Sequence, residues 1–103
     1  MSKIITPYYY QVYERKGIKW FALDGGRVFY NGTNQPINLQ NVEQEFGLSD
    51  EQIMIELFRV NGGKPGFYLG NLRDHKFYYC GLKWEDIKTT LLQLGIGRAE
   101  PQR

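Results

Sequence analysis

The residues best suited to catalysis near neutral pH are a single histidine, His75, and a single cysteine, Cys80. Both fall on one predicted hairpin, with His75 between Asp74 and Lys76 at its turn. A nucleophilic cysteine needs a nearby base and a lowered thiol pKa, and no third side chain is placed to orient this pair. We therefore expect a solvated turn histidine, a sheet-facing cysteine and no catalytic residue.

The other patterns that could carry chemistry have simpler structural explanations. Paired carboxylates fit solvated helix faces or first-turn acids, and paired glycines fit hairpin turns, because neither glycine pair has the spacing of a phosphate-binding loop. These pairs are Glu43/Glu45, Asp50/Glu51, Glu85/Asp86, Gly25/Gly26 and Gly62/Gly63. A lone cysteine also excludes an internal disulfide and a thiolate-rich zinc site. We expect a protein that is not an enzyme and has no cofactor and no metal.

Length and composition indicate one small folded domain. The chain has 103 residues, a formal net charge of +2 and a 16% share of aromatic residues, which argues against intrinsic disorder. A single thiol suits a reducing cytoplasm, and no apolar run approaches the about 20 residues of a membrane span. We expect one domain over residues 1–97, a flexible tail over 98–103 and a cytoplasmic location.

The elements that must position these residues follow from turn signals and apolar spacing. In the first half, strands are predicted over 8–15, 19–23 and 27–31, with turns at Lys16-Gly17 and Asp24-Gly25-Gly26. Leu39, Val42 and Phe46 recur at helical spacing between the N-cap Asn38 and the stop Gly47.

The second half has the same predicted order. Strands are expected over 53–60, 66–69 and 76–80, and Trp84, Ile87, Leu91 and Leu94 then share one helical face. Gly95 and Ile96 fit the end of that helix in a Schellman motif.

The two halves therefore align as an internal repeat, with Val12 matching Leu57 and Phe21 matching Phe67. We predict an α+β fold whose antiparallel sheet comes from two pseudo-repeated βββα units, at 7–48 and 53–97.

This layout, with a Trp or Phe in the second strand and a glycine-containing hairpin after it, resembles the small duplicated domains of the YegP-like family. The stretch from Lys64-Pro65-Gly66-Phe67-Tyr68-Leu69 to Gly95-Ile96-Gly97 also resembles small uncharacterised proteins of cyanobacteria. Neither resemblance implies an activity or a site residue.

One segment has an alternative interpretation. Ser49-Asp50-Glu51-Gln52 is a capping box, and Leu48 with Ile53 would form a hydrophobic staple, so residues 49–60 would be helical and the order βββααββα. A helix-turn-helix would then place Asp50, Glu51 and Glu56 against DNA, where their charge has the wrong sign. The strand is preferred because Ile53, Ile55 and Leu57 alternate and because the repeat requires it.

Aromatic residues are the most informative feature for function. Alternation along the strands predicts one core face that carries Tyr8, Tyr10, Val12, Phe21, Leu23, Ile53, Ile55, Leu57, Phe67 and Leu69. The opposite face is predicted to carry Tyr9, Tyr13, Trp20, Met54, Phe58 and Tyr68, joined by Phe29 and Tyr78. Two short helices cover only one side of a six-stranded sheet, so this second face is either an exposed interface or an internal contact between the two units.

These features favour a non-catalytic interaction module that self-associates, as a homodimer, or docks a protein partner. Its predicted partner-binding residues are Tyr9, Tyr13, Trp20, Phe58, Tyr68 and Tyr78. The alternative is single-stranded nucleic-acid binding by aromatic stacking, with flanking Arg15, Lys19, Arg27, Arg73 and Lys76 near the hairpin ends.

Overall fold

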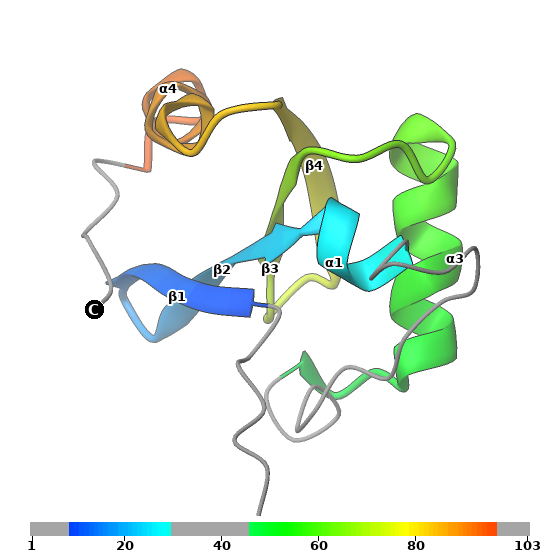
Figure 1. The fold of residues 1–103 in the computed structure, drawn as a ribbon. Helices are drawn as coiled ribbons and strands as arrows, with labels where there is room; N and C mark the ends of the chain where they lie inside the picture. The colour runs from blue at the N-terminus through cyan, green and yellow to red at the C-terminus, as the bar shows by residue number, and fades with distance from the viewer. Residues whose placement is uncertain (1–8, 30–45, 97–103) are drawn as a thin grey trace, which may run out of the picture.

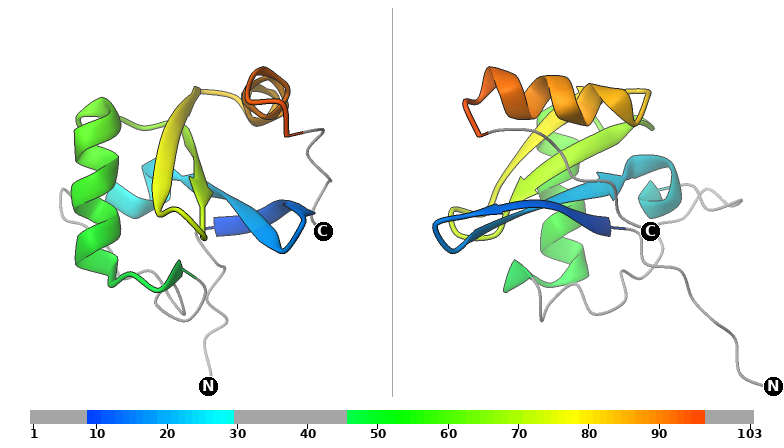
Figure 2. Two further views of the ribbon diagram at one scale, coloured as in Figure 1. Left: turned by 180° about the vertical axis from the view of Figure 1, so that it is seen from behind. Right: turned by 90° about the vertical axis from the view of Figure 1, so that its left-hand side faces the viewer.

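A computed structural model describes residues 9–29 and 46–96 of the chain. In order, its elements are β1 (Tyr9–Arg15), β2 (Ile18–Asp24), α1 (Gly25–Phe29), α3 (Asp50–Asn61), β3 (Phe67–Asn71), β4 (Lys76–Gly81) and α4 (Glu85–Gln93). The strands form one antiparallel sheet in the order β1-β2-β3-β4. Helices α1 and α3 lie against one face and α4 against the other (Figure 1, Figure 2). The predicted α+β class with an antiparallel sheet is confirmed.

The first hairpin forms as its turn residues predict. Lys16 and Gly17 both have positive φ, at 55° and 79°, which is the geometry of a two-residue type I′ turn. Arg15 therefore pairs with Ile18, and a bulge between Gln11 and Tyr13 shifts the register further along. The bulge fixes which side chains of β1 share a face with those of β2.

The predicted third strand over 27–31 is wrong over residues 27–29, the part that the structure describes, because Asp24-Gly25-Gly26 starts helix α1 instead of a hairpin turn. The Asp24 carboxylate accepts hydrogen bonds from the backbone N–H groups of Gly26 at 3.1 Å and Arg27 at 3.4 Å, as an N-cap does. A Cβ on Gly25 would lie 2.6 Å from the Tyr68 ring, so glycine is needed there for close packing and not for a reverse turn.

The predicted strand over 53–60 is also wrong, and the alternative helix is what forms. Both hydrogen bonds of the capping box are present: Gln52 N–H donates to Ser49 Oγ at 3.2 Å, and Ser49 N–H donates to Gln52 Oε1 at 2.8 Å. Gly62 closes the helix with φ 64°, and its N–H donates to the Phe58 carbonyl at 2.7 Å. Local capping decides this segment, since alternation of three apolar residues occurs in helices as well.

These two corrections remove the residue pairing of the proposed repeat. Val12 lies on a strand and Leu57 on a helix, so the backbones at these two positions do not superpose. The described part of the first unit is ββα, and the second begins with a helix before its two strands. Predictions for residues 30–45 and 98–103, which include most of the helix from Asn38, lie outside the described residues.

The second half otherwise follows its sequence signals. Strands β3 and β4 and helix α4 lie where they were predicted, with Arg73, Asp74 and His75 in the turn between the strands. At the end of α4, Gly95 has φ 74° and donates to Leu92, while Ile96 donates to Leu91 at 2.9 Å. These are the two hydrogen bonds of the predicted Schellman motif.

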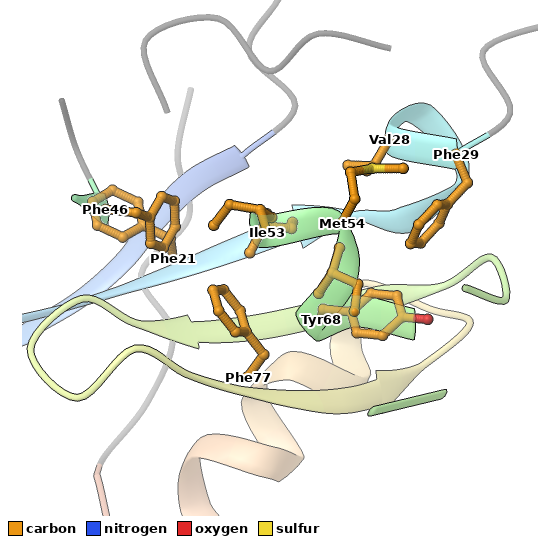
Figure 3. Packing of buried hydrophobic residues seen from close by; sticks show 10 residues of the cluster. Phe21, Val28, Phe29, Phe46, Ile53, Met54, Tyr68 and Phe77 are labelled. Carbon is orange, nitrogen blue, oxygen red and sulfur yellow. The ribbon is translucent and has the colours of Figure 1, made fainter. Parts of the chain in front are cut away.

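Two apolar clusters, one on each face of the sheet, hold the molecule together. The α3-side cluster packs α1 and α3 against the sheet and consists of Phe21, Leu23, Val28, Phe29, Phe46, Ile53, Met54, Leu57, Tyr68 and Phe77 (Figure 3). The α4-side cluster consists of Val12, Trp20, Ala22, Leu69, Ile87 and Leu91. The sheet therefore has a helix on each face, where the sequence predicted helices on one.

Candidate binding surface on helix α3

The six predicted partner-binding residues do not form one exposed face. Tyr9 and Tyr68 pack in or against the α3-side cluster, whereas Tyr13, Trp20 and Tyr78 belong to the α4-side cluster. Phe58 lies on α3 itself. The prediction of a shared aromatic sheet face is wrong for a geometric reason: Tyr10 pairs with Ala22 and Tyr9 with Leu23, so Tyr9 points to the side opposite Trp20.

Burial separates these residues further. Trp20 is only 8% exposed and Tyr68 is fully buried, and the Tyr68 hydroxyl donates to the Lys64 carbonyl at 2.7 Å. The predicted core face is divided in the same way, with Phe21 and Leu23 in one cluster and Val12 and Leu69 in the other. In the part of the chain that the structure describes, neither sheet face is left open as a large aromatic surface.

The only described cysteine and histidine lie apart and do not form a pair. His75 precedes β4 and Cys80 lies near the other end of that strand, about 17 Å away for five residues of extended chain. Burial raises the pKa of the Cys80 thiol from 9.0 to about 11, which Asp86 reinforces and a hydrogen bond with Thr90 opposes. A thiol with a raised pKa is a poor nucleophile at neutral pH.

Among the described residues, no three His, Cys, Asp or Glu side chains gather in a way that could hold a metal ion. In the same part of the chain, no helix has the length and apolar character required to cross a membrane.

Two exposed apolar side chains stand together on α3. Ile55 is 57% exposed and Phe58 is 52% exposed, and their i, i+3 spacing makes them neighbours on the helix surface. Ile53 and Leu57, two residues on either side of Ile55, are fully buried. At about 100° per residue, Ile55 therefore points away from the sheet that the other two contact. We call Ile55 and Phe58 with the flanking Glu51, Gln52 and Arg59 the outer face of α3.

The Phe58 ring is held in place by contacts with Phe29 and Gly63 of the same chain. Its ring packs edge-to-face on Phe29 at 5.0 Å between centroids. A Cβ on Gly63, which has φ 72°, would lie 2.5 Å from the Phe58 ring, so the glycine lets the ring lie directly over the backbone. The exposed half of this ring is thus presented in one orientation, which lowers the entropy cost of contact with a partner.

A shallow hollow of about 290 Å³ adjoins the outer face of α3 at the N-terminal half of the helix. It is lined by Leu48, Gln52, Ile55, Glu56 and His75. The Glu56 carboxylate also forms an ion pair with Arg59, one helical turn further on, with 2.7 Å between Oε1 and Nη2. The outer face therefore combines apolar side chains at its centre with charges of both signs around them, as the rim of an interface does.

Within residues 9–29 and 46–96, the other large exposed apolar residues are Leu82, Leu92 and Leu94, none of which forms such a pair. Leu92 and Leu94 are two residues apart around the end of α4 and point in different directions, and Leu82 precedes that helix. The sequence signal that could have identified the outer face of α3 was the capping box, since a helix over 50–61 places Ile55 opposite Ile53 and Leu57.

The predicted basic residues divide between the two ends of the sheet. Arg15 and Lys19 flank the β1–β2 turn, and Arg73 and Lys76 flank the β3–β4 turn at the same end, where Leu72 N–H donates to the Lys19 carbonyl at 3.2 Å. Arg27 lies at the opposite end and donates to the Tyr10 hydroxyl at 3.3 Å.

Neither a family model, nor a curated protein, nor a solved structure matches this chain. The resemblance to YegP-like domains therefore stays a prediction.

Proposed function

We propose that this chain is a non-catalytic cytoplasmic interaction module that binds another protein or a second copy of itself through the outer face of α3. The observation that carries the proposal is the pair Ile55 and Phe58, both more than half exposed on a helix whose other side is fully packed. Exposed apolar neighbours in a fixed orientation are what an interface core requires. This surface replaces the sheet face on which the sequence placed the contact.

The test compares two exposed apolar positions on different helices. Ile55→Asp places a charge at the centre of the outer face of α3, and Leu92→Asp places the same charge at a 61% exposed position on α4. Both proteins should fold, because surface substitutions usually change stability by about 0.5 kcal/mol or less.

Association is read from the mass in solution and from proteins captured with a tagged chain. Capture and association should be lost in Ile55→Asp and retained in Leu92→Asp, with melting curves confirming that both are folded. A folded Ile55→Asp protein that keeps every partner and its wild-type mass would exclude the outer face of α3 as the contact.

The second candidate function is single-stranded nucleic-acid binding at the basic end of the sheet. It is supported by Arg15, Lys19, Arg73 and Lys76, which lie in or beside the two adjacent turns, with the partly exposed Tyr13 and Tyr78 on the nearby α4 side. It is supported less well than docking, because Trp20 and Tyr68 are too buried to stack on bases. Salt-dependent binding of a fluorescent oligothymidylate that is lost in Arg73→Glu but kept in Ile55→Asp would favour this function.

A further inference from the structure

We infer that the partner at the outer face of α3 is a second copy of this chain, with the two α3 helices antiparallel about a twofold axis through Ile55. The inference rests on the proposed function and specifies its partner. Its basis is the charge pattern around Ile55 and not the exposure of the face alone.

Opposite charges are placed symmetrically about Ile55. Glu51 is four residues before it and Arg59 four residues after it, and both side chains are exposed. When two such helices cross antiparallel at Ile55, Glu51 of each copy reaches the same level as Arg59 of the other. A parallel pair would instead bring Glu51 level with Glu51 and Arg59 level with Arg59, which like-charge repulsion disfavours.

The local contacts of Arg59 leave it able to reach a second copy. Its Nε donates to Glu56 at 2.8 Å and its Nη2 lies 2.7 Å from the same carboxylate oxygen. A guanidinium has five N–H donors, so these contacts leave donors for a further carboxylate. An isologous contact of this kind needs only one patch that complements itself, as Ile55 with Glu51 and Arg59 does.

The contact is expected to be modest in strength. A helix of 12 residues is about 18 Å long, and a single helix pair is small beside the roughly 800 Å² per partner of a standard interface. The dimer should therefore form and dissociate over the micromolar range, and its mass should depend on concentration.

The experiment exchanges charges at the two ends of the face. Glu51→Arg gives a copy with basic residues at both positions, and Arg59→Glu gives one with acidic residues at both. Each variant alone should dimerise at least about tenfold more weakly than the wild type in sedimentation equilibrium. An equimolar mixture of the two should form a heterodimer, and the double variant should dimerise alone, because both arrangements restore opposite charges at both levels.

The matched control is Lys88→Glu, which makes the same charge change as Arg59→Glu at an exposed position on α4 and should leave the dimer intact. A second measurement does not depend on charge. Ile55→Cys in a Cys80→Ser background should form a disulfide between copies under mild oxidation, because the twofold axis passes through position 55, whereas Gln93→Cys on α4 should not.

Two results would overturn the inference. The first is a wild-type chain that stays monomeric up to millimolar concentration. The second is a dimer that neither responds to the charge exchange nor cross-links at position 55. If the wild type is monomeric and Ile55→Asp nevertheless loses a captured protein, the outer face of α3 binds a different protein, and the inferred homodimer is excluded. If Ile55→Asp changes neither mass nor capture, the proposed function fails with it.

Discussion

Truncation of Trp20 should strongly destabilise the packing on the α4 side of the sheet. Trp20 lies on β2, is only 8% exposed and shares its cluster with Ile87 and Leu91, the two buried residues of α4. Trp20→Ala removes the indole and leaves a cavity between sheet and helix. Large-to-small changes of this kind cost about 3–5 kcal/mol, because the lost transfer free energy and the cavity both contribute. A small domain has a total stability of about 5–15 kcal/mol, so the loss is a large share.

Urea denaturation followed by fluorescence and circular dichroism measures this loss directly. For a domain near this size, each kcal/mol shifts the melting temperature by about 4–8 °C, so Trp20→Ala should melt at least about 12 °C lower than the wild type. Leu92→Ala is the matched control on α4, since Leu92 is 61% exposed and its truncation should cost no more than about 0.5 kcal/mol.

One result would contradict the placement of Trp20 in a core. If Trp20→Ala keeps the wild-type melting temperature but loses association with a partner, Trp20 is an interface residue and not part of a core. The sheet face predicted from the aromatic pattern would then be the docking surface, and the packing of α4 over it would be wrong.

Three further changes test the features that set the fold. Ser49→Ala should lower the free energy of unfolding by about 1 kcal/mol in urea, since the first turn of α3 loses its side-chain cap, and an unchanged midpoint would contradict the capping box. Gly25→Ala should cost about 1–3 kcal/mol in the same assay, because its Cβ would lie 2.6 Å from the Tyr68 ring. Gly26→Ala is its control, with the nearest atom at 3.4 Å, and equal losses would argue against the close approach. For Cys80, the folded pKa of about 11 lies above the ordinary 9.0, so its contribution to stability is complete below pH 9 and is lost as the pH rises through 11. The wild type should lose stability more steeply than Cys80→Ser over that interval, and parallel curves would contradict the raised pKa.

Signals confined to a few consecutive residues determined much of this structure. Lys16-Gly17 specified the first hairpin, Ser49 with Gln52 specified the start of α3, and Gly95 with Ile96 specified the end of α4. Each acts through hydrogen bonds or backbone angles within about five residues, so the local sequence is sufficient to specify the turn or the helix end. The strand preferred over 53–60 was wrong because the repeat outweighed such a local signal.

Asp24-Gly25-Gly26 shows where local signals are insufficient. The same three residues suit a hairpin turn or a helix start, and the choice depends on Tyr68 and Gly66, more than forty residues away. Gly25 N–H donates to the Gly66 carbonyl at 2.7 Å, and the Tyr68 ring packs where a Cβ would stand. Only the tertiary structure brings these groups to Gly25.

The candidate site depends on tertiary structure for the same reason. Alternation along a strand correctly separated Trp20 from Phe21, but it does not specify which face of β1 joins which face of β2 or which helix covers each face. The turn and the bulge set that register, and the clusters on the two faces set the coverage. Local sequence signals predicted the fold class, the hairpin at Lys16-Gly17 and the end of α4. The exposure of Ile55 and the burial of Trp20 depend instead on which distant surfaces pack together, since burial is a property of the assembled chain.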